Sequence, residues 1–298
     1  MAVLIDPPRW PAHGTIFAHL VSDSSLDELH SFAAAAGVPP RAFDHDHYDV
    51  PERRYADLVA RGAEEVSSTE LVRRLVRSGL RTRTPERTPK RSQVRPLLAA
   101  GWATLLPGQE WLGAQLLERW SEEHRHYHDV RHLAQCLAAL DLGAAQGPVD
   151  DTVRLAAWFH DAVYEGTAGA DEEASAALAE ELLPRASVSS DEVTEVARLV
   201  RLTAHHAPAS DDLAGQQLCD ADLSILGQAA GRYHVYVRDI RLEYGHVSDE
   251  LFRVGRLQVL ERLLSLNPLF HTPTARRLWA ATARTNLEAE RRRWLAEG

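Results

Sequence analysis

The 298-residue chain has only two cysteines, Cys136 and Cys219. Two thiols in a chain of this length do not make a disulfide framework, so a reducing compartment is the simpler interpretation. No apolar run approaches the ~20 residues that span a bilayer. Residues 1–10 also lack the basic and apolar regions of a secretory signal. We therefore expect a soluble cytoplasmic protein that does not contact a membrane.

The chain also lacks an excess of basic residues, since its formal net charge is −10. This charge argues against a general nucleic-acid binder. Small anionic substrates stay compatible with it, because a bound metal ion and a few arginines can outweigh the overall charge locally. There is no internal repeat, and 298 residues are enough for two domains. The oligomeric state does not follow from the sequence.

Residues 1–83 have the pattern of a small α/β domain. Short apolar runs at 2–5 and 16–21 are bounded by proline, glycine and serine, which predicts strands. Ser25 and Glu28 are spaced as a capping box at the start of a helix that ends at Gly37. A third extended segment is expected around 42–50. Further helices are expected from Pro51 and over 69–80.

A basic, proline-containing stretch follows and has no apolar period. We interpret residues 84–97 as a linker or an exposed arm. From residue 98 to 298 the apolar residues recur at helical spacing, which predicts an all-α domain. Ser189 with Glu192, and Thr272 with Pro273, mark two helix starts within it. The chain is therefore predicted to be multidomain, with a small α/β domain before an all-α domain.

Metal-binding residue types recur in order along the predicted helical domain. Four histidines lie within residues 124–132, His160 and Asp161 follow an apolar run, and Asp220 and Asp222 come later. His128 and His132 are four residues apart, so a helix would point both in the same direction. Either Asp220 or Asp222 can face the site while the other caps or orients. Neutral imidazoles with carboxylates suit Mn²⁺, Mg²⁺, Zn²⁺ or iron, with open positions for water and substrate.

A structural role competes with this interpretation. A single histidine is more often structural than a ligand, and we expect His124 and His126 to face solvent or to orient their neighbours. His160 and Asp161 differ, because a polar pair after an apolar run is costly to bury without partners.

The ordered series of His, His-Asp and Asp on a helical domain resembles the HD superfamily of metal-dependent phosphohydrolases. The resemblance extends over about residues 100–290 and rests on the segments 126–132, 157–164, 220–227, 240–244 and 255–256. It implies a divalent metal ion and favours Asp222 over Asp220. The ligands that it implies are His132, His160, Asp161 and Asp222.

The spacing of Tyr127, His128 and His132 also resembles the start of the cyclic-nucleotide phosphodiesterase motif. This resemblance implies that His128 is the proton donor and His132 the ligand, rather than the reverse. The expected reaction is attack of metal-activated water on phosphorus. Asp161 would orient or deprotonate the water, and His128 would protonate the leaving oxygen.

Charge on the phosphoryl oxygens would be met by arginine, for which Arg241 and Arg256 are the candidates. His205 is expected to contact the substrate, a small phosphorylated metabolite or a nucleotide, or to orient a neighbouring residue of the site. Residues 162–204 contain no histidine, which favours one metal ion, or a second ion held mostly by bridging water and Asp161. The alternative functions are a nucleotide-binding sensor without catalysis and a di-iron oxygenase.

Residues 1–83 resemble a small bacterial domain of unassigned function, from which no chemistry can be transferred. Polar residues there are expected near strand ends, where α/β sheets often carry sites. They either form a second polar pocket or serve as caps and loop hydrogen bonds. These residues are Asp6, His19, Asp23, His47 and Asp49.

Overall fold

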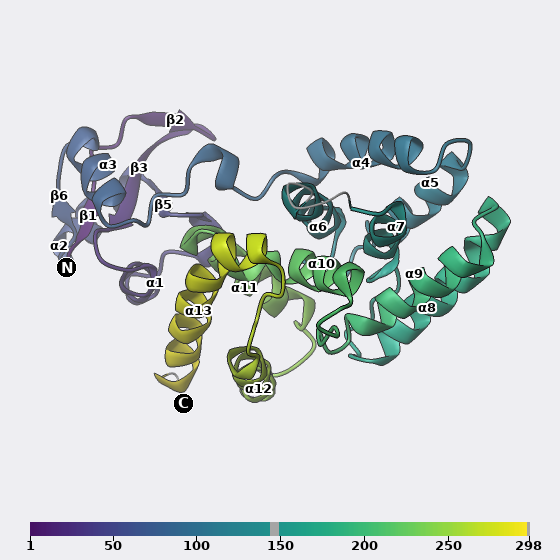
Figure 1. Cartoon of the computed structure of the whole chain (residues 1–298). Helices are drawn as coiled ribbons and strands as arrows, with labels where there is room; N and C mark the ends of the chain where they lie inside the picture. The colour runs from purple at the N-terminus through teal and green to yellow at the C-terminus, as the bar shows by residue number, and fades with distance from the viewer. Residues whose placement is uncertain (144–148, 297–298) are drawn as a thin grey trace. The chain divides into compact units, whose positions relative to one another are not determined.

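The computed structural model describes residues 1–143 and 149–296, which divide into two compact units. The first unit comprises residues 1–87 and 229–235, and the second comprises 88–228 and the residues from 236 onward. A mixed α/β part precedes a long helical part along the chain (Figure 1). This order confirms the predicted fold class.

The first unit is built on a mixed sheet with the strand order β4-β5-β3-β1-β6, and β2 pairs with β3. Only β1 and β6 pair in parallel; the other neighbours are antiparallel. The strands are β1 (Val3–Ile5), β2 (Trp10–Ala12), β3 (Thr15–Ser22), β4 (Phe43–Asp44), β5 (His47–Pro51) and β6 (Glu64–Glu65). The helices are α1 (Leu26–Ala35), α2 (Tyr55–Ala60) and α3 (Ser68–Arg77), with short 3₁₀ turns at Pro40–Ala42, Glu52–Arg54 and Thr84–Glu86.

Helices α1 and α3 pack on opposite faces of this sheet. Ile5 and Leu20 belong to the core cluster that contains the buried residues of α1. Leu4 and Val21, which neighbour them on the same strands, pack instead with Leu71 and Leu75 of α3. Side chains alternate between the two faces of a strand, so central strands covered on both faces are apolar at every position. This explains the short continuous apolar runs in the sequence.

The predicted start of α1 is confirmed, with one difference. Ser25 is the N-cap, and its hydroxyl accepts a hydrogen bond from the Glu28 backbone N–H at 3.1 Å. The Glu28 carboxylate accepts from the hydroxyls of Ser22 and Ser24 instead of closing the capping box. Ser22 and Ser24, which precede the N-cap, therefore bind the Glu28 carboxylate that a capping box would direct to the Ser25 backbone N–H.

The second unit is helical. Its elements are α4 (Arg91–Leu105), α5 (Glu110–Arg119), α6 (Val130–Gly143), α7 (Asp151–Phe159), α8 (Ala170–Leu182), α9 (Ser190–Leu202), α10 (Leu213–Asp222), the 3₁₀ turns η5 (Pro184–Ala186) and η6 (Leu223–Gly227), α11 (Ala230–Glu243), α12 (Asp249–Ser265) and α13 (Pro273–Ala296). The first residues of α11 belong to the first unit. None of the helices described here has both the length and the apolar character needed to cross a membrane.

Helix α4 begins inside the stretch interpreted as a linker. It starts at Arg91 and carries Pro96 in its interior. Proline at this sixth helical position lacks the N–H that would bond to the Ser92 carbonyl, so the helix forms with one backbone hydrogen bond fewer. Val94 and Leu98 are buried on this helix. Because prolines and basic residues dominate the composition of this stretch, the sequence did not predict the start of the amphipathic helix α4.

Helix α7 lies at the centre of the helical core. It contacts α6, α8, α9 and α10, and five consecutive residues, Leu155 to Phe159, are buried. The Trp120 indole N–H donates to the Trp158 carbonyl at 2.9 Å, and the Trp102 ring meets the Trp158 ring edge-on. A helix buried on all sides is rigid, so the polar residues at its end, His160 and Asp161, are fixed in place.

Candidate metal centre

Three helices bring four metal-binding side chains to one point. His132 lies in the first turn of α6, His160 ends α7 and is followed by Asp161, and Asp222 is the last residue of α10. The His132 and His160 Nε2 atoms are 3.1 Å apart. Asp161 Oδ2 lies 3.6 and 3.2 Å from these two nitrogens, and Asp222 Oδ1 lies 3.1 and 3.6 Å from them. Metal–ligand bonds of about 2.0–2.2 Å place neighbouring ligands about 3.0–3.5 Å apart, so this spacing fits a coordination shell.

The His160 ring is oriented by its own helix. Its Nδ1 lies 2.8 Å from the carbonyl oxygen of Ala157, to which it donates. That tautomer leaves the Nε2 lone pair directed at the cluster, which is the arrangement that second-shell hydrogen bonds impose on metal-binding histidines. His132 is buried between aromatic rings, with Tyr127 4.8 Å and Trp120 6.2 Å from its ring centre.

The electrostatics of the cluster favour a bound cation. Burial raises the pKa values of Asp161 and Asp222, but the nearby imidazoles lower them more, so both carboxyls have a lowered pKa. Burial lowers the pKa of His132, whereas the charges of Asp161 and Asp222 outweigh burial at His160 and raise its pKa. The protein thus holds two carboxylates and a single imidazolium in a buried space, and a divalent ion would replace that proton.

Cys136 is a further donor in the same cluster. Its Sγ lies 3.6 Å from His132 Nε2, and His132, Cys136, His160 and Asp222 together form a buried group that can bind a metal ion. Burial and then the charges of Asp222 and Asp161 raise the pKa of the Cys136 thiol well above its ordinary value. A neutral thiol is a weak ligand, because metals bind the thiolate.

His206 adds a third imidazole at the edge of the cluster. Its Nε2 lies 2.7 Å from Asp222 Oδ2, the oxygen turned away from His132 and His160. Its backbone has a φ of 53°, a left-handed conformation that histidine adopts more readily than most residues. Of the adjacent pair, His206 therefore faces the site. His205, predicted to contact the substrate, is exposed and is not among the described residues lining the cavity beside the cluster.

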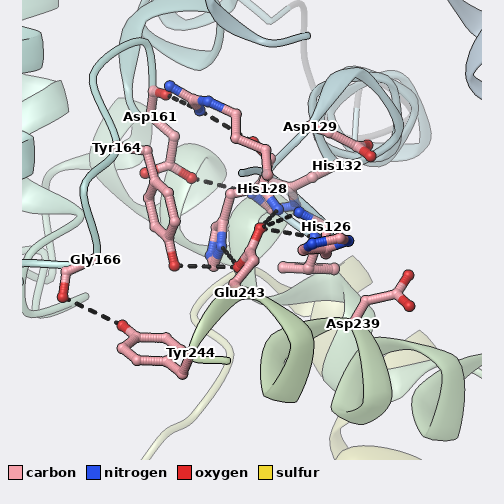
Figure 2. A network of polar contacts seen from close by, with 12 residues as sticks. His126, His128, Asp129, His132, Asp161, Tyr164, Gly166, Asp239, Glu243 and Tyr244 are labelled. Atoms are coloured by element: carbon pink, nitrogen blue, oxygen red, sulfur yellow. Dashed lines mark hydrogen bonds and ion pairs between the residues drawn. The ribbon is translucent and has the colours of Figure 1, made fainter. Parts of the chain in front are cut away.

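The Nδ1 atom of His128 is directed away from the cluster. It pairs with the carboxylate of Glu243, which the sequence did not predict as a site residue. Its Nδ1 lies 2.8 Å from Glu243 Oε2, and its ring stacks on Tyr164 with centres 4.2 Å apart. The Tyr164 hydroxyl donates to the same Glu243 oxygen at 3.2 Å. Figure 2 shows these three side chains side by side, with His132 and Asp161 nearby.

Glu243 also organises the backbone that carries His128. Its Oε1 accepts the backbone N–H groups of His126, Tyr127 and His128 at 2.7–2.8 Å. Burial raises the pKa of Glu243, but the His128 charge and these hydrogen bonds lower it to about 2. Burial lowers the pKa of His128, and the charge of Glu243 and their hydrogen bond raise it above its ordinary value. The pair is therefore a buried imidazolium–carboxylate.

A fully buried arginine joins the segments that carry His128 and Asp161. Arg125 donates to the carbonyl oxygens of His128, Asp161 and Ala162 at 2.7–3.2 Å. Its guanidinium also pairs with Glu122 and lies over the rings of Trp120 and Tyr164. Arginine suits this position because its fixed set of N–H donors can satisfy several carbonyls at once.

The cluster opens onto a cavity of about 470 Å³. His128, Asp161, His206 and Asp222 line its polar part. The remaining lining is largely apolar and aromatic, and includes Tyr127, Tyr164, Ile240, Tyr244, Phe252, Val259 and Leu263. A volume of this size suits a small organic ligand.

The two arginines predicted to bind phosphate are occupied by other partners. Arg241 pairs with Asp249 and donates to the carbonyls of Tyr244 and Val247, and it is not among the described residues of the lining. Arg256 lines the cavity but is buried, with Glu290 at 2.8 and 3.0 Å and the Tyr236 hydroxyl at 3.0 Å. Sequence alone cannot show that an arginine has an acidic partner on a distant helix.

The remaining candidates have structural contacts. Asp220 accepts the backbone N–H groups of His271 and Thr272, both at 2.7 Å, ahead of α13. His124 is exposed and contacts the Tyr164 carbonyl at 2.8 Å, and His126 is half-buried. Of the aspartates left open by residue spacing, Asp222 therefore faces the cluster and Asp220 anchors a neighbouring segment.

Residues 3–78 match one family. Its description is a protein of unknown function (DUF4031), and the match lies within the mixed α/β part of the chain. This confirms the resemblance of the N-terminal part to a domain of unassigned function. No curated protein and no solved structure matches the chain. The family match does not extend to the helical unit, so the candidate metal centre has no support from a known relative.

Proposed function

We propose that the helical unit is a metal-dependent phosphohydrolase of the HD type, acting on a small phosphorylated metabolite or a nucleotide. The observation that carries the proposal is the approach of two imidazole nitrogens and two carboxylate oxygens to within 3.1–3.6 Å beside a cavity that His128 also lines. The ordered resemblance of the sequence to the HD superfamily agrees with it.

In this proposal His132, His160, Asp161 and Asp222 hold the ion. Two neutral imidazoles with two carboxylates suit Mn²⁺, Fe²⁺, Zn²⁺ or Mg²⁺ better than a protonated thiol does, so Cys136 packs behind the site as a neutral side chain. A bound divalent ion supplies a water of lowered pKa and a positive charge for phosphoryl oxygens. The exposed fraction of Asp161 and Asp222, about one seventh each, leaves the cavity side of the cluster accessible.

His128 serves as the general acid. Because Glu243 holds Nδ1, the proton available to a substrate is the one on Nε2. The buried carboxylate keeps the ring protonated, and stacking on Tyr164 fixes its plane. Asp161, through its carboxylate, orients the attacking water and accepts its proton.

The cavity lining supports an organic phosphate as the substrate class. Arg262 is the cation left for an anionic group: it lines the cavity, is exposed and makes no ion pair with the described residues. The aromatic and aliphatic lining suits an organic leaving group such as a nucleoside. We therefore place the phosphoryl group at the metal cluster and the organic part against the apolar lining.

The test is phosphate release by the purified chain. The protein is stripped with a chelator, reloaded separately with Mn²⁺, Fe²⁺, Zn²⁺ or Mg²⁺, and assayed against a panel of nucleotides and sugar phosphates. We expect turnover that depends on the added metal and is abolished in His160→Ala. The matched control is His13→Asn, which removes an exposed imidazole in the first unit, at a left-handed position that asparagine tolerates.

Two results would refute the hydrolase. Nucleotide binding by the metal-loaded chain without turnover of any panel member would favour the sensor. Oxygen-dependent turnover that is lost in His160→Ala, with two irons lost in the same variant, would favour the oxygenase.

A further inference from the structure

A second group of metal-binding side chains lies in the first unit, on the sheet. His19 on β3 pairs directly with Asp49 on β5, and His47 lies two residues before Asp49 on the same strand. Residues opposite one another and two apart on a strand share one face of a sheet. The three side chains therefore meet on one surface.

The cluster has the dimensions of an open metal site. His47 Nε2 and His19 Nε2 lie 3.5 and 3.8 Å from Asp49 Oδ1, and one donor atom from each residue lies within 4.8 Å of the others. The two distances to Asp49 Oδ1 are at or slightly above the ~3.0–3.5 Å that bonds of about 2.0–2.2 Å place between neighbouring ligands, so closing the shell needs a small adjustment. Asp49 is 47% exposed, so its side chain is free to make that adjustment.

The Nδ1 atom of each imidazole contacts a buried carboxylate, while Nε2 faces Asp49. His47 Nδ1 lies 2.7 Å from Asp46 Oδ1, and His19 Nδ1 lies 3.3 Å from Asp6 Oδ2. Carboxylates that accept from Nδ1 fix the tautomer in which Nε2 carries the lone pair, the usual support of a metal-binding histidine.

These two carboxylates are fixed in turn. Asp6 accepts the His19 backbone N–H at 2.6 Å and the Ser68 hydroxyl at 2.7 Å. Asp46, whose side chain is fully buried, accepts the Thr82 backbone N–H at 2.7 Å and pairs with Arg81. Caps and loop hydrogen bonds explain Asp6 and Asp46 but not Asp49, whose side-chain contacts in the described part of the chain are with the two imidazoles. Asp23 is separate, since it pairs with Arg74 and the Ala2 backbone N–H.

We propose that His19, His47 and Asp49 bind a divalent first-row transition-metal ion in the first unit, with Asp6 and Asp46 as its supporting shell. Two imidazoles and one carboxylate suit zinc, iron or cobalt and leave coordination positions open to water or a ligand. Trp10, whose ring centre lies 5.4 Å from that of His19, flanks the site. This site does not depend on the hydrolase proposed for the helical unit.

The test uses Co²⁺ and the full chain carrying His160→Ala, which disables the helical cluster. After chelator treatment, visible absorption and metal analysis follow the titration. We expect one equivalent of Co²⁺ with ligand-field bands in the visible range. Asp49→Asn on this background is expected to weaken binding by at least ~10-fold, and Asp6→Asn by ~10–100-fold, the effect typical of a supporting carboxylate.

The matched control is Glu52→Gln, which removes one exposed carboxylate close to β5 and is expected to leave Co²⁺ binding unchanged. His19→Gln serves as a second ligand variant, and Asp222→Asn as a second background if His160→Ala does not fold by circular dichroism. Absence of stoichiometric Co²⁺ binding in the folded background overturns the proposal, and so does unchanged binding in folded Asp49→Asn and His19→Gln.

Discussion

At the scale of single residues, the proposed general acid His128 and the proposed ligands His160 and Asp222 are each held by a neighbour outside the proposed ligand set. Glu243 holds the Nδ1 of His128, the Ala157 carbonyl holds that of His160, and His206 contacts the outer oxygen of Asp222. Such contacts fix the protonation and direction of a donor before any ligand arrives, which lowers the cost of ordering it on binding.

The His128–Glu243 pair makes a pH-dependent contribution to stability. The pKa of His128 is raised in the folded protein, so its contribution is complete below the ordinary value of about 6.5 and is lost as pH rises through the raised value. The pKa of Glu243 falls from 4.5 to about 2, so its contribution is present above 4.5 and is lost as pH falls toward 2. Both contributions are complete between about pH 4.5 and 6.5.

We therefore predict that Glu243→Gln lowers the free energy of unfolding most between those pH values. Breaking a buried ion pair costs about 3–5 kcal/mol. Urea unfolding of the metal-free chain from pH 3 to 9 measures the difference from wild type. Glu250→Gln, an exposed change in the first turn of α12, is the control. A difference that stays constant with pH would show that the pair is not ionised as described.

The two nearby aspartates should separate stability from metal binding. Asp222→Asn removes an oxygen of the cluster and is expected to weaken metal binding strongly. Asp220→Asn replaces a carboxylate that accepts two backbone N–H groups, so we expect a loss of about 1–3 kcal/mol in unfolding free energy with metal affinity retained. Thermal unfolding and metal titration of both variants check this. Equal loss of metal binding in the two would contradict the assignment.

At the scale of elements, packing between η6 and α13 positions the segment that follows Asp222. A Cβ built on Gly227 would lie 2.3 Å from the Trp279 Cβ and 2.7 Å from its Cα. Neither atom can move without shifting α13. Asn286 of the same helix donates to the carbonyls of Leu226 and Gln228, which attaches the end of η6 to α13.

Gly227→Ala is accordingly predicted to destabilise the chain by about 1–3 kcal/mol through overpacking. The matched change is Gly101→Ala in α4, where a Cβ meets open space. There we expect a gain of about 0.5–1 kcal/mol from the higher helix propensity of alanine. Chemical denaturation of the two variants gives the comparison. The same sign of effect in both would be inconsistent with this packing.

The elements also show which structural features sequence patterns can predict. Local signals predicted the strands at β1 and β3, the start of α13 at Thr272 and the capping box of Ser189, because each depends on a few neighbouring residues. Periodicity missed the start of α4, where prolines and charges dominate the composition.

The same limit applies to the site. His132, His160 and Asp161 stand out because donors follow apolar helical residues directly. Glu243 could not be predicted, since it lies 115 residues from His128 and its role depends on how α11 packs. The pairing of Arg256 with Glu290 is equally a tertiary contact.

At the scale of the whole molecule, two compact units each carry a candidate ion site of different composition. The helical cluster is buried, whereas Asp49 in the first unit is half-exposed. Ligand binding stabilises the state that binds it, by about 2.7 kcal/mol when the free ion is at 100 times its dissociation constant. Ions should therefore stabilise the two units separately.

We predict that each of two single variants removes the metal-dependent stabilisation of one unit only. His160→Ala should abolish the metal-dependent stabilisation of the helical unit and keep that of the first unit, and Asp49→Asn should do the reverse. Calorimetry of each variant with and without Zn²⁺ measures the two contributions, and the double variant should show neither. Loss of both effects in one single variant would mean that the ions do not bind independently.

The first turns of α11 complete the first unit from far along the chain. Ala230 packs against the core cluster of the sheet and α1, and a Cβ on Gly231 would lie 2.0 Å from the His45 carbonyl oxygen. A fragment that ends at Arg87 would therefore expose apolar surface that the intact protein covers. Ribosomal synthesis delivers residues 1–87 well before 229–235, so the nascent first unit remains incomplete until most of the helical unit has emerged.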